Sequence, residues 1–228
     1  MNVLKYKTHR FPLRYLLLTA RWDLLILPAA LWALCAIIIL ILGGNMNSYN
    51  TAVGFLGGLL PLMGGILAAY AVLDDPALEL YFSSPVSAWI TLLERVGFIL
   101  LILALSAFSF QLILPVLGVD LTPLGSPLIR QFAWIAPSLS LTALGIAAGL
   151  LLAQSTFGAM LVGLVWILQV IMRDWFNTNE IARWFALFLA ILRPGTTFLP
   201  TNQLSLTGLA LLFFIVAWWL LRKQERYI

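Results

Sequence analysis

Long apolar stretches alternate with short polar segments along most of this chain. These stretches cover residues 24 to 42, 52 to 73, 92 to 117, 130 to 153, 157 to 172 and 204 to 221, six in all. A helix needs about 20 apolar residues to cross about 30 Å of hydrocarbon, and only helices or closed barrels pair every backbone polar group there. The pattern therefore predicts an all-α, polytopic membrane protein with six transmembrane helices.

The composition predicts a single membrane domain that covers residues 1–228. Hydrophobic residues make up 62% of the chain and charged residues only 10%, which leaves too few polar positions for a separate soluble core. The lone Cys35 lies inside an apolar run, so no disulfide can form within the chain. We expect Cys35 to be packed in the interior.

The basic residues predict the orientation in the membrane. Nine of the 13 Lys and Arg fall on one side of a six-span topology: Lys5, Lys7, Arg10, Arg14, Arg21, Arg95, Arg222, Lys223 and Arg226. The other four are Arg130, Arg173, Arg183 and Arg193. This excess favours a multi-pass protein of the plasma or inner membrane with both termini in the cytoplasm. Because the basic residues are scattered over span ends rather than gathered in one patch, we expect no nucleic acid partner.

Two segments outside the spans have their own expected structures. In residues 1–23, Arg14 and Arg21 are seven residues apart and share one helix face, which indicates an amphipathic interfacial helix or an ordinary positive-inside anchor. Residues 173–203 contain an apolar run, Trp184 to Leu192, whose nine residues reach only about 14 Å as a helix. That run is too short to cross, so we expect a re-entrant or interfacial helical hairpin on the outer side, before the last span.

Several chemistries lack the residues they need. His9 is the only histidine, which argues against haem ligation within a span and against histidine-rich metal sites. None of the three lysines follows the glycine pattern of a phosphate-binding loop, and no serine sits in a GxSxG motif. We therefore expect no enzyme activity, no cofactor and no metal on this chain. The absence of charges in the middle of the spans also argues against ion-coupled transport.

Residues 74–89, DDPALELYFSSPVSAW, hold the most informative motif. Asp75 before Pro76 and Ser84 before Pro85 are two successive helix starts, so a short helix is expected ahead of the third span. Its apolar stripe and its polar face consist of Leu78, Tyr81 and Phe82, and of Glu79 and Ser83. Such a helix suits a docking groove on a partner, and the alternative is a solvated loop with two prolines.

This segment resembles the coupling helix in the membrane subunits of ATP-binding-cassette transporters of the type-2 exporter class. The residues that match in order are Asp75, Leu78, Glu79, Leu80, Ser84, Pro85, Val86 and Ser87. The likeness extends to the basic N-terminal segment, the six spans, the tight turn at Gln154 to Thr156 and the outer region before the last span.

The resemblance implies a permease without its own ATPase site. Two such chains, or this chain and a related permease, would form the pathway, and ABC ATPase subunits that carry ATP and Mg would dock on Asp75, Leu78, Glu79, Leu80, Tyr81, Phe82, Ser84 and Pro85. It also implies that the first and fifth spans lie near the contact between copies. We expect the glycine pairs Gly54 and Gly58, and Gly145 and Gly149, to bring helices together within one subunit rather than between subunits.

The substrate is weakly encoded. Uncharged polar and aromatic residues in the spans suit an amphipathic or hydrophobic molecule, and the pathway candidates are Phe55, Phe108, Gln111, Trp166 and Gln169. Packing against lipid or neighbouring helices is the alternative for the aromatic residues. Two other functions stay open: a haem-exporter-like subunit of cytochrome c maturation, and a membrane scaffold or sensor that transports nothing.

Overall fold

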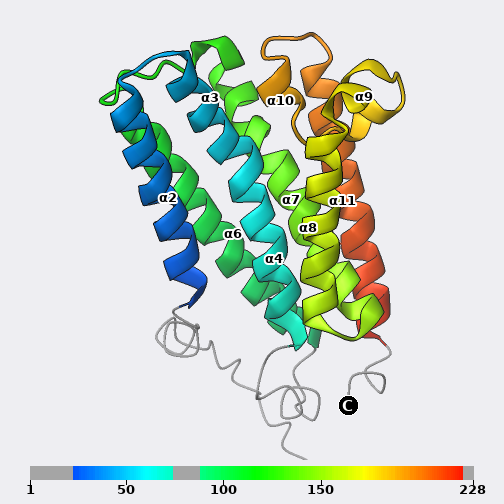
Figure 1. The fold of residues 1–228 in the computed structure, drawn as a ribbon. Coiled ribbons are helices and arrows are strands. Elements are labelled where there is room, and N and C mark those ends of the chain that lie inside the picture. Colours follow the sequence, from blue (N-terminus) through cyan, green and yellow to red (C-terminus); the bar gives the residue numbers. More distant parts are fainter. Residues whose placement is uncertain (1–22, 74–87, 223–228) are drawn as a thin grey trace, which may run out of the picture.

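A computed structural model describes residues 23–73 and 88–222, which fold into helices and no strands (Figure 1). The long segments are α2 (Asp23–Leu42), the continuous run of α3 (Met46–Gly54), η1 (Phe55–Leu59) and α4 (Leu60–Leu73), then α6 (Ala88–Ile113), α7 (Pro127–Leu152), α8 (Ser155–Ile171) and α11 (Leu199–Leu221). The predicted N-terminal helix and almost all of the predicted coupling helix lie outside the described residues.

The long segments run up and down alternately, so the bundle has two distinct ends (Figure 1). The lower end holds the start of α2, the break between α4 and α6, the α7–α8 turn and the end of α11. The upper end holds residues 114–126 and four short elements: η2 (Thr122–Leu124), α9 (Arg173–Thr178), η3 (Ala182–Phe185) and α10 (Leu189–Leu192). The described chain therefore begins and finishes at the same end of the bundle.

Four helices of the described chain are long and apolar enough to cross a membrane: Met46–Ala71, Leu92–Ile113, Pro127–Leu152 and Leu199–Leu221. The apolar parts of α2 and α8, Ile26–Leu42 and Ser155–Ile171, are shorter. The all-helical class predicted from the hydrophobic pattern is confirmed for the described residues, and the four apolar helices are compatible with a multi-pass membrane protein. Cys35 is buried in α2, as predicted.

Helix boundaries depart from the predicted ones where polar residues cap or begin a helix. The second segment begins at Met46 instead of residue 52, because the Asn45 side chain accepts hydrogen bonds from the N–H groups of Asn47 and Ser48. The last begins at Leu199 instead of residue 204, with Pro200 in its first turn. Hydropathy alone could not place these starts, since their first turns are polar.

Glycines bring α4, α7 and α8 into backbone contact. A Cβ added to Gly145 on α7 would clash with the carbonyl oxygen of Gly65 on α4, and one added to Gly158 on α8 would lie 2.7 Å from the backbone nitrogen of Gly149. Small residues allow this close approach. In lipid the hydrophobic effect does not drive helices together, so close packing of this kind holds them instead. The expected role of Gly145 and Gly149 within one subunit is confirmed, whereas Gly54 faces open space.

The predicted tight turn between the fourth and fifth stretches is present. Helix α7 ends at Leu152 and α8 starts at Ser155. The backbone N–H of Ala153 donates to Leu150 and that of Gln154 donates to Gly149, a Schellman motif in which Ala153 takes the left-handed conformation (φ 52°). The turn satisfies the last carbonyls of α7 and joins two antiparallel helices.

Candidate functional site

The upper end contains an irregular stretch, with two short helical turns, that packs into the bundle. The apolar run from Trp184 to Leu192, predicted to belong to a helical hairpin, is split between η3 and α10, each about one turn long. Leu187, Phe188 and Leu189 between and within these turns are 4%, 8% and 3% exposed. We call residues 182–192 the capping segment, because it covers the helices beneath it at the upper end (Figure 1).

Two buried amide side chains hold the capping segment. Gln169 on α8 donates from Nε2 to the carbonyl of Phe185 (3.1 Å) and accepts at Oε1 from the N–H of Leu187 (2.7 Å). Asn202 on α11 places Nδ2 within 2.9 to 3.1 Å of the carbonyl oxygens of Arg183, Trp184 and Ala186. These amides supply the hydrogen bonds that the irregular backbone cannot make with itself, and unpaired backbone groups are costly in apolar surroundings.

Beneath the capping segment lies the π-helical turn η1. Trp166 on α8 donates from Nε1 to the carbonyl of Gly58 (3.0 Å), and its ring meets that of Phe188 edge-on with centroids 5.7 Å apart. A Cβ on Gly57 would lie 3.2 Å from the Ile191 side chain. The two glycines of η1 thus leave room for α10, and turns of this kind recur at functional positions in helices.

A second polar group joins α6 and α7. The amides of Gln111 and Gln131 are paired, with N···O distances of 2.9 and 3.3 Å, and Trp134 Nε1 donates to Gln131 Oε1 (2.8 Å). The ring of Phe108 meets Trp134 edge-on at 5.9 Å. Paired amides of this sort link two helices without leaving a polar group unsatisfied in an apolar region.

The five predicted pathway residues fall into separate groups. Trp166 and Gln169 lie together under the capping segment, and Phe108 and Gln111 lie together at the α6–α7 contact. Phe55 is fully buried against Phe110, with ring centroids 4.3 Å apart. All five contact other parts of this chain, and their role in a substrate pathway stays a prediction.

Sequence reasoning overlooked Gln131, Asn202, Gly65 and Gly158. Each carries a signal in hindsight. Gln131 and Asn202 are amides at the start of apolar stretches, and the two glycines stand within apolar helices. The sequence does not indicate which groups these amides bind. Asn202 bonds to a segment 16 to 19 residues earlier, and Gln131 bonds to Gln111, 20 residues earlier.

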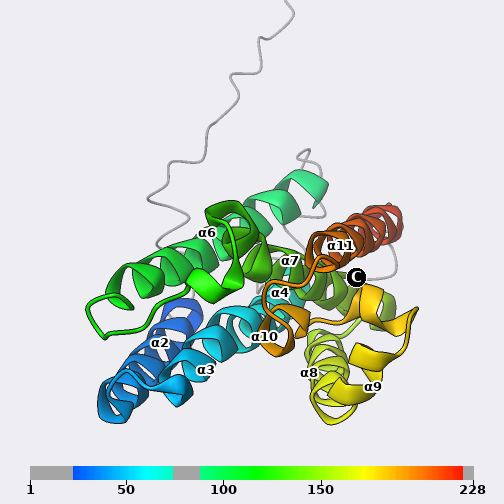
Figure 2. The same cartoon turned by 90° about the horizontal axis from the view of Figure 1, so that it is seen from above.

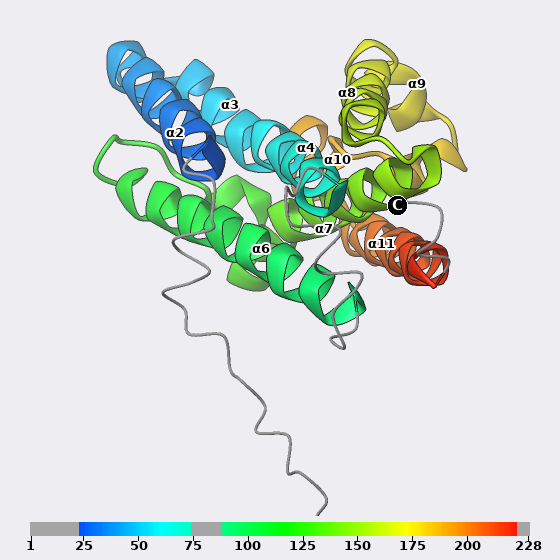
Figure 3. The same cartoon turned by 90° about the horizontal axis from the view of Figure 1, so that it is seen from below.

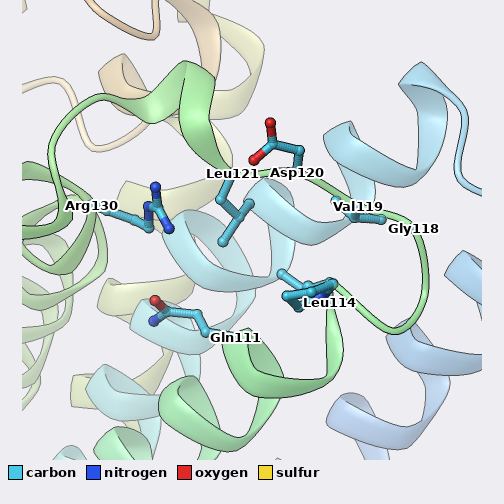
Figure 4. Close-up of a pocket in the computed structure, with 8 residues that line it drawn as sticks. Gln111, Leu114, Gly118, Val119, Asp120, Leu121 and Arg130 are labelled. Atoms are coloured by element: carbon cyan, nitrogen blue, oxygen red, sulfur yellow. The ribbon is translucent and has the colours of Figure 1, made fainter.

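A pocket of about 360 Å³ opens at the upper end between the end of α6, the loop that follows and the start of α7 (Figure 4). Its lining consists of Gln111, Leu114, Pro115, Gly118, Val119, Asp120, Leu121 and Arg130. The hydroxyl of Thr122 and its backbone N–H (2.9 Å) donate to the Asp120 carboxylate and hold its pKa below the ordinary value, and the charge of Arg130 acts in the same direction. Asp120 is therefore anionic throughout the physiological range.

At the lower end, a hydrogen bond joins Arg95 on α6 to the last turn of α4. Arg95 Nη1 donates to the carbonyl of Ala71 at 2.6 Å, so a cation satisfies one of the last carbonyls of α4. The candidate docking residues Asp75 to Pro85 lie outside the described residues, and their role stays a prediction. Among the described residues, no three His, Cys, Asp or Glu side chains are grouped closely enough to hold a metal ion.

Comparisons of this chain with protein-family models, with curated proteins and with solved structures give no match.

Proposed function

We propose that this chain is the membrane subunit of an ATP-driven exporter that resembles the type-2 class of ATP-binding-cassette transporters. It would move an amphipathic or hydrophobic substrate out of the cytoplasm. ATP and Mg would bind to separate ATPase subunits rather than to this chain. Residues 74–89 are the observation that carries the proposal, because their order of acidic, apolar and Ser-Pro positions matches a coupling helix.

The arrangement of the helix ends supports this assignment. Helix α4 stops at Leu73 and α6 begins at Ala88, both at the lower end, where α2 also begins and α11 finishes (Figure 1). The excess of Lys and Arg in the segments next to this end makes it the cytoplasmic one in our proposal. An ATPase docked from the cytoplasm would therefore meet residues 74–89.

The proposal includes six spans rather than four. Helix α2 has 20 residues and α8 has 17, lengths of about 30 Å and 25 Å that fall within the range of membrane-spanning helices. Both run alongside the longer helices of the bundle (Figure 1). In this topology the capping segment is the outer, re-entrant element. Its backbone is hydrogen-bonded to the buried side chains of Gln169 and Asn202, which suits a segment packed against membrane-spanning helices.

A second copy of the chain, or a related permease, would pack on the side formed by α2 and α8. Viewed along the bundle, α2 and α8 lie at the two ends of the layer that α3 and α4 form, with α2 also beside α6 (Figures 2 and 3). Both expose large apolar side chains, among them Leu34, Ile41, Met160 and Leu164.

Coupling to an ATPase gives the decisive experiment. The complex is purified from native membranes in mild detergent, and phosphate release is measured with and without candidate amphiphiles. We expect an ATPase to co-purify, and Glu79→Lys to lower amphiphile-stimulated hydrolysis at unchanged expression, since charge reversal would repel a basic groove. Glu180→Lys, a reversal at an exposed site of the upper end, is the matched control and should leave hydrolysis unchanged.

Other outcomes would decide between the alternatives. A stable complex without any ATPase would favour a scaffold or sensor. ATP hydrolysis stimulated by haem and by no other amphiphile would favour a haem-exporter-like subunit. Unaltered coupling in Glu79→Lys would contradict the docking role of residues 74–89.

A further inference from the structure

The pocket at the upper end combines apolar walls with two opposite charges. Leu114, Val119 and Leu121 form apolar lining, and Asp120 in the loop and Arg130 on α7 line the pocket as well. Figure 4 shows Arg130 and Gln111 reaching from α7 and α6 into the space below the loop that carries Asp120. A volume of about 360 Å³ is in the range of sites for small ligands.

Arg130 lies near the N-terminus of α7, where a positive side chain is electrostatically unfavourable. It lies in the first turns of α7, which is capped by Ser126, and the positive end of the helix dipole disfavours a positive side chain there. Its Nε is buried and finds no hydrogen-bond partner among the residues that the structure describes. A buried donor of a charged group without a partner is unfavourable. The guanidinium group also lines the pocket, where it can bind an anion through its charge and its N–H donors.

Asp120 provides the complementary charge. Its carboxylate accepts two hydrogen bonds from Thr122, which leaves lone pairs for a further donor. Because the group stays anionic and is exposed at the rim, a ligand that carries only negative charge would meet repulsion from it. The ligand that satisfies both groups is a zwitterion with a phosphate for Arg130 and an ammonium for Asp120.

We propose that this pocket binds the headgroup of an aminophospholipid, with its phosphate on Arg130 and its ammonium on Asp120. The pocket lies at the ends of α6 and α7, two helices long and apolar enough to cross a membrane, which is the depth at which headgroups lie. The apolar lining would contact the glycerol and the first acyl carbons. This inference does not rest on the transport proposal, since it needs only that the bundle lies in a bilayer.

Native mass spectrometry of the delipidated full chain in mild detergent tests the proposal. Dioleoyl phosphatidylethanolamine and dioleoyl phosphatidylglycerol are titrated separately, because both carry the phosphate and only the first carries the ammonium. We expect the wild-type chain to bind phosphatidylethanolamine about tenfold more tightly than phosphatidylglycerol. Arg130→Gln should weaken both lipids about tenfold, and Asp120→Asn should abolish the preference between them.

Arg193→Gln and Asp174→Asn are the matched controls, since both residues are exposed charges of the upper end outside the pocket lining. Both should bind like the wild type. Equal binding of the two lipids by the wild-type chain would overturn the proposal even if the Arg130 variant failed to fold. Soluble phosphoethanolamine is the last probe: if it bound as tightly as the lipid, the pocket would belong to a soluble phosphate compound and the lipid assignment would be wrong.

Discussion

The two central segments of the bundle are more buried than the two peripheral ones but less hydrophobic, the reverse of the usual relation between burial and hydropathy. In the 18-residue apolar windows of Met46–Ala71 and Pro127–Leu152, 78% and 72% is buried, with a mean hydropathy of 1.9 each. In those of Leu92–Ile113 and Leu199–Leu221 only 33% and 28% is buried, although the mean hydropathy is higher, at 2.4 and 2.3. In this chain the more apolar helices are the more exposed ones.

Lipid as a solvent explains the inversion. Acyl chains are as apolar as leucine, so a peripheral helix gains nothing by hiding its leucines, and a central helix is selected for close packing instead. The central segments accordingly contain Gly64, Gly65, Gly145 and the buried Thr142 at their contact. Small residues, some of them with a hydroxyl group, rather than high hydrophobicity, mark the inner helices.

The largest expected effect comes from adding a methyl group where the two central segments touch. Gly145→Ala would place a methyl group against the backbone oxygen of Gly65, a clash that no side-chain movement can relieve. We expect the free energy of unfolding to fall by about 3 kcal/mol or more. The measurement is the unfolding midpoint of the detergent-purified chain, followed by circular dichroism.

Gly208→Ala is the matched control on the periphery, since a Cβ there meets nothing within 4 Å. It should leave stability unchanged or raise it by up to about 1 kcal/mol through helix propensity. Similar losses in both variants would show that glycine acts through helix flexibility and not through the α4–α7 contact.

A smaller effect is expected where a peripheral helix holds the capping segment. Asn202→Ala on α11 removes the donor shared by the carbonyls of Arg183, Trp184 and Ala186 and should lower the free energy of unfolding by about 2 kcal/mol. Thr207→Ala on the same helix is the control, because its hydroxyl bonds only to Gln203 within α11. Thermal unfolding and protease cleavage within residues 179–198 provide the two readouts.

Equal protease resistance in Asn202→Ala and in the wild type would contradict this anchoring role. If the bond holds the segment, cleavage should accelerate in Asn202→Ala alone. Gln169→Leu, which removes the two bonds from α8, should act in the same direction.

The sequence predicted the elements of this fold better than their partners. Every predicted apolar stretch corresponds to a helix, because an apolar solvent would impose length and composition on each helix separately. The turn at Ala153 was equally local. By contrast, the roles of Gln169 and Asn202 depend on residues that lie 16 or more positions away, and no local pattern specifies which carbonyls an amide will reach. The capping segment was predicted as too short to cross, but its division into η3 and α10 follows from these distant bonds.

The smallest effect is expected from a comparison of a buried and an exposed leucine on one peripheral helix, α6. Leu103 and Leu105 on α6 are 0% and 62% exposed. Leu103→Ala should lower the free energy of unfolding by about 2 kcal/mol, because it leaves a cavity beside Gly64 that lipid cannot fill. Leu105→Ala should change it by less than about 0.5 kcal/mol, since lipid or detergent takes the place of the lost methyl groups. If both variants lose the same stability in a bilayer, α6 is covered by protein on its outer face, and the division into central and peripheral helices would hold for the single chain only.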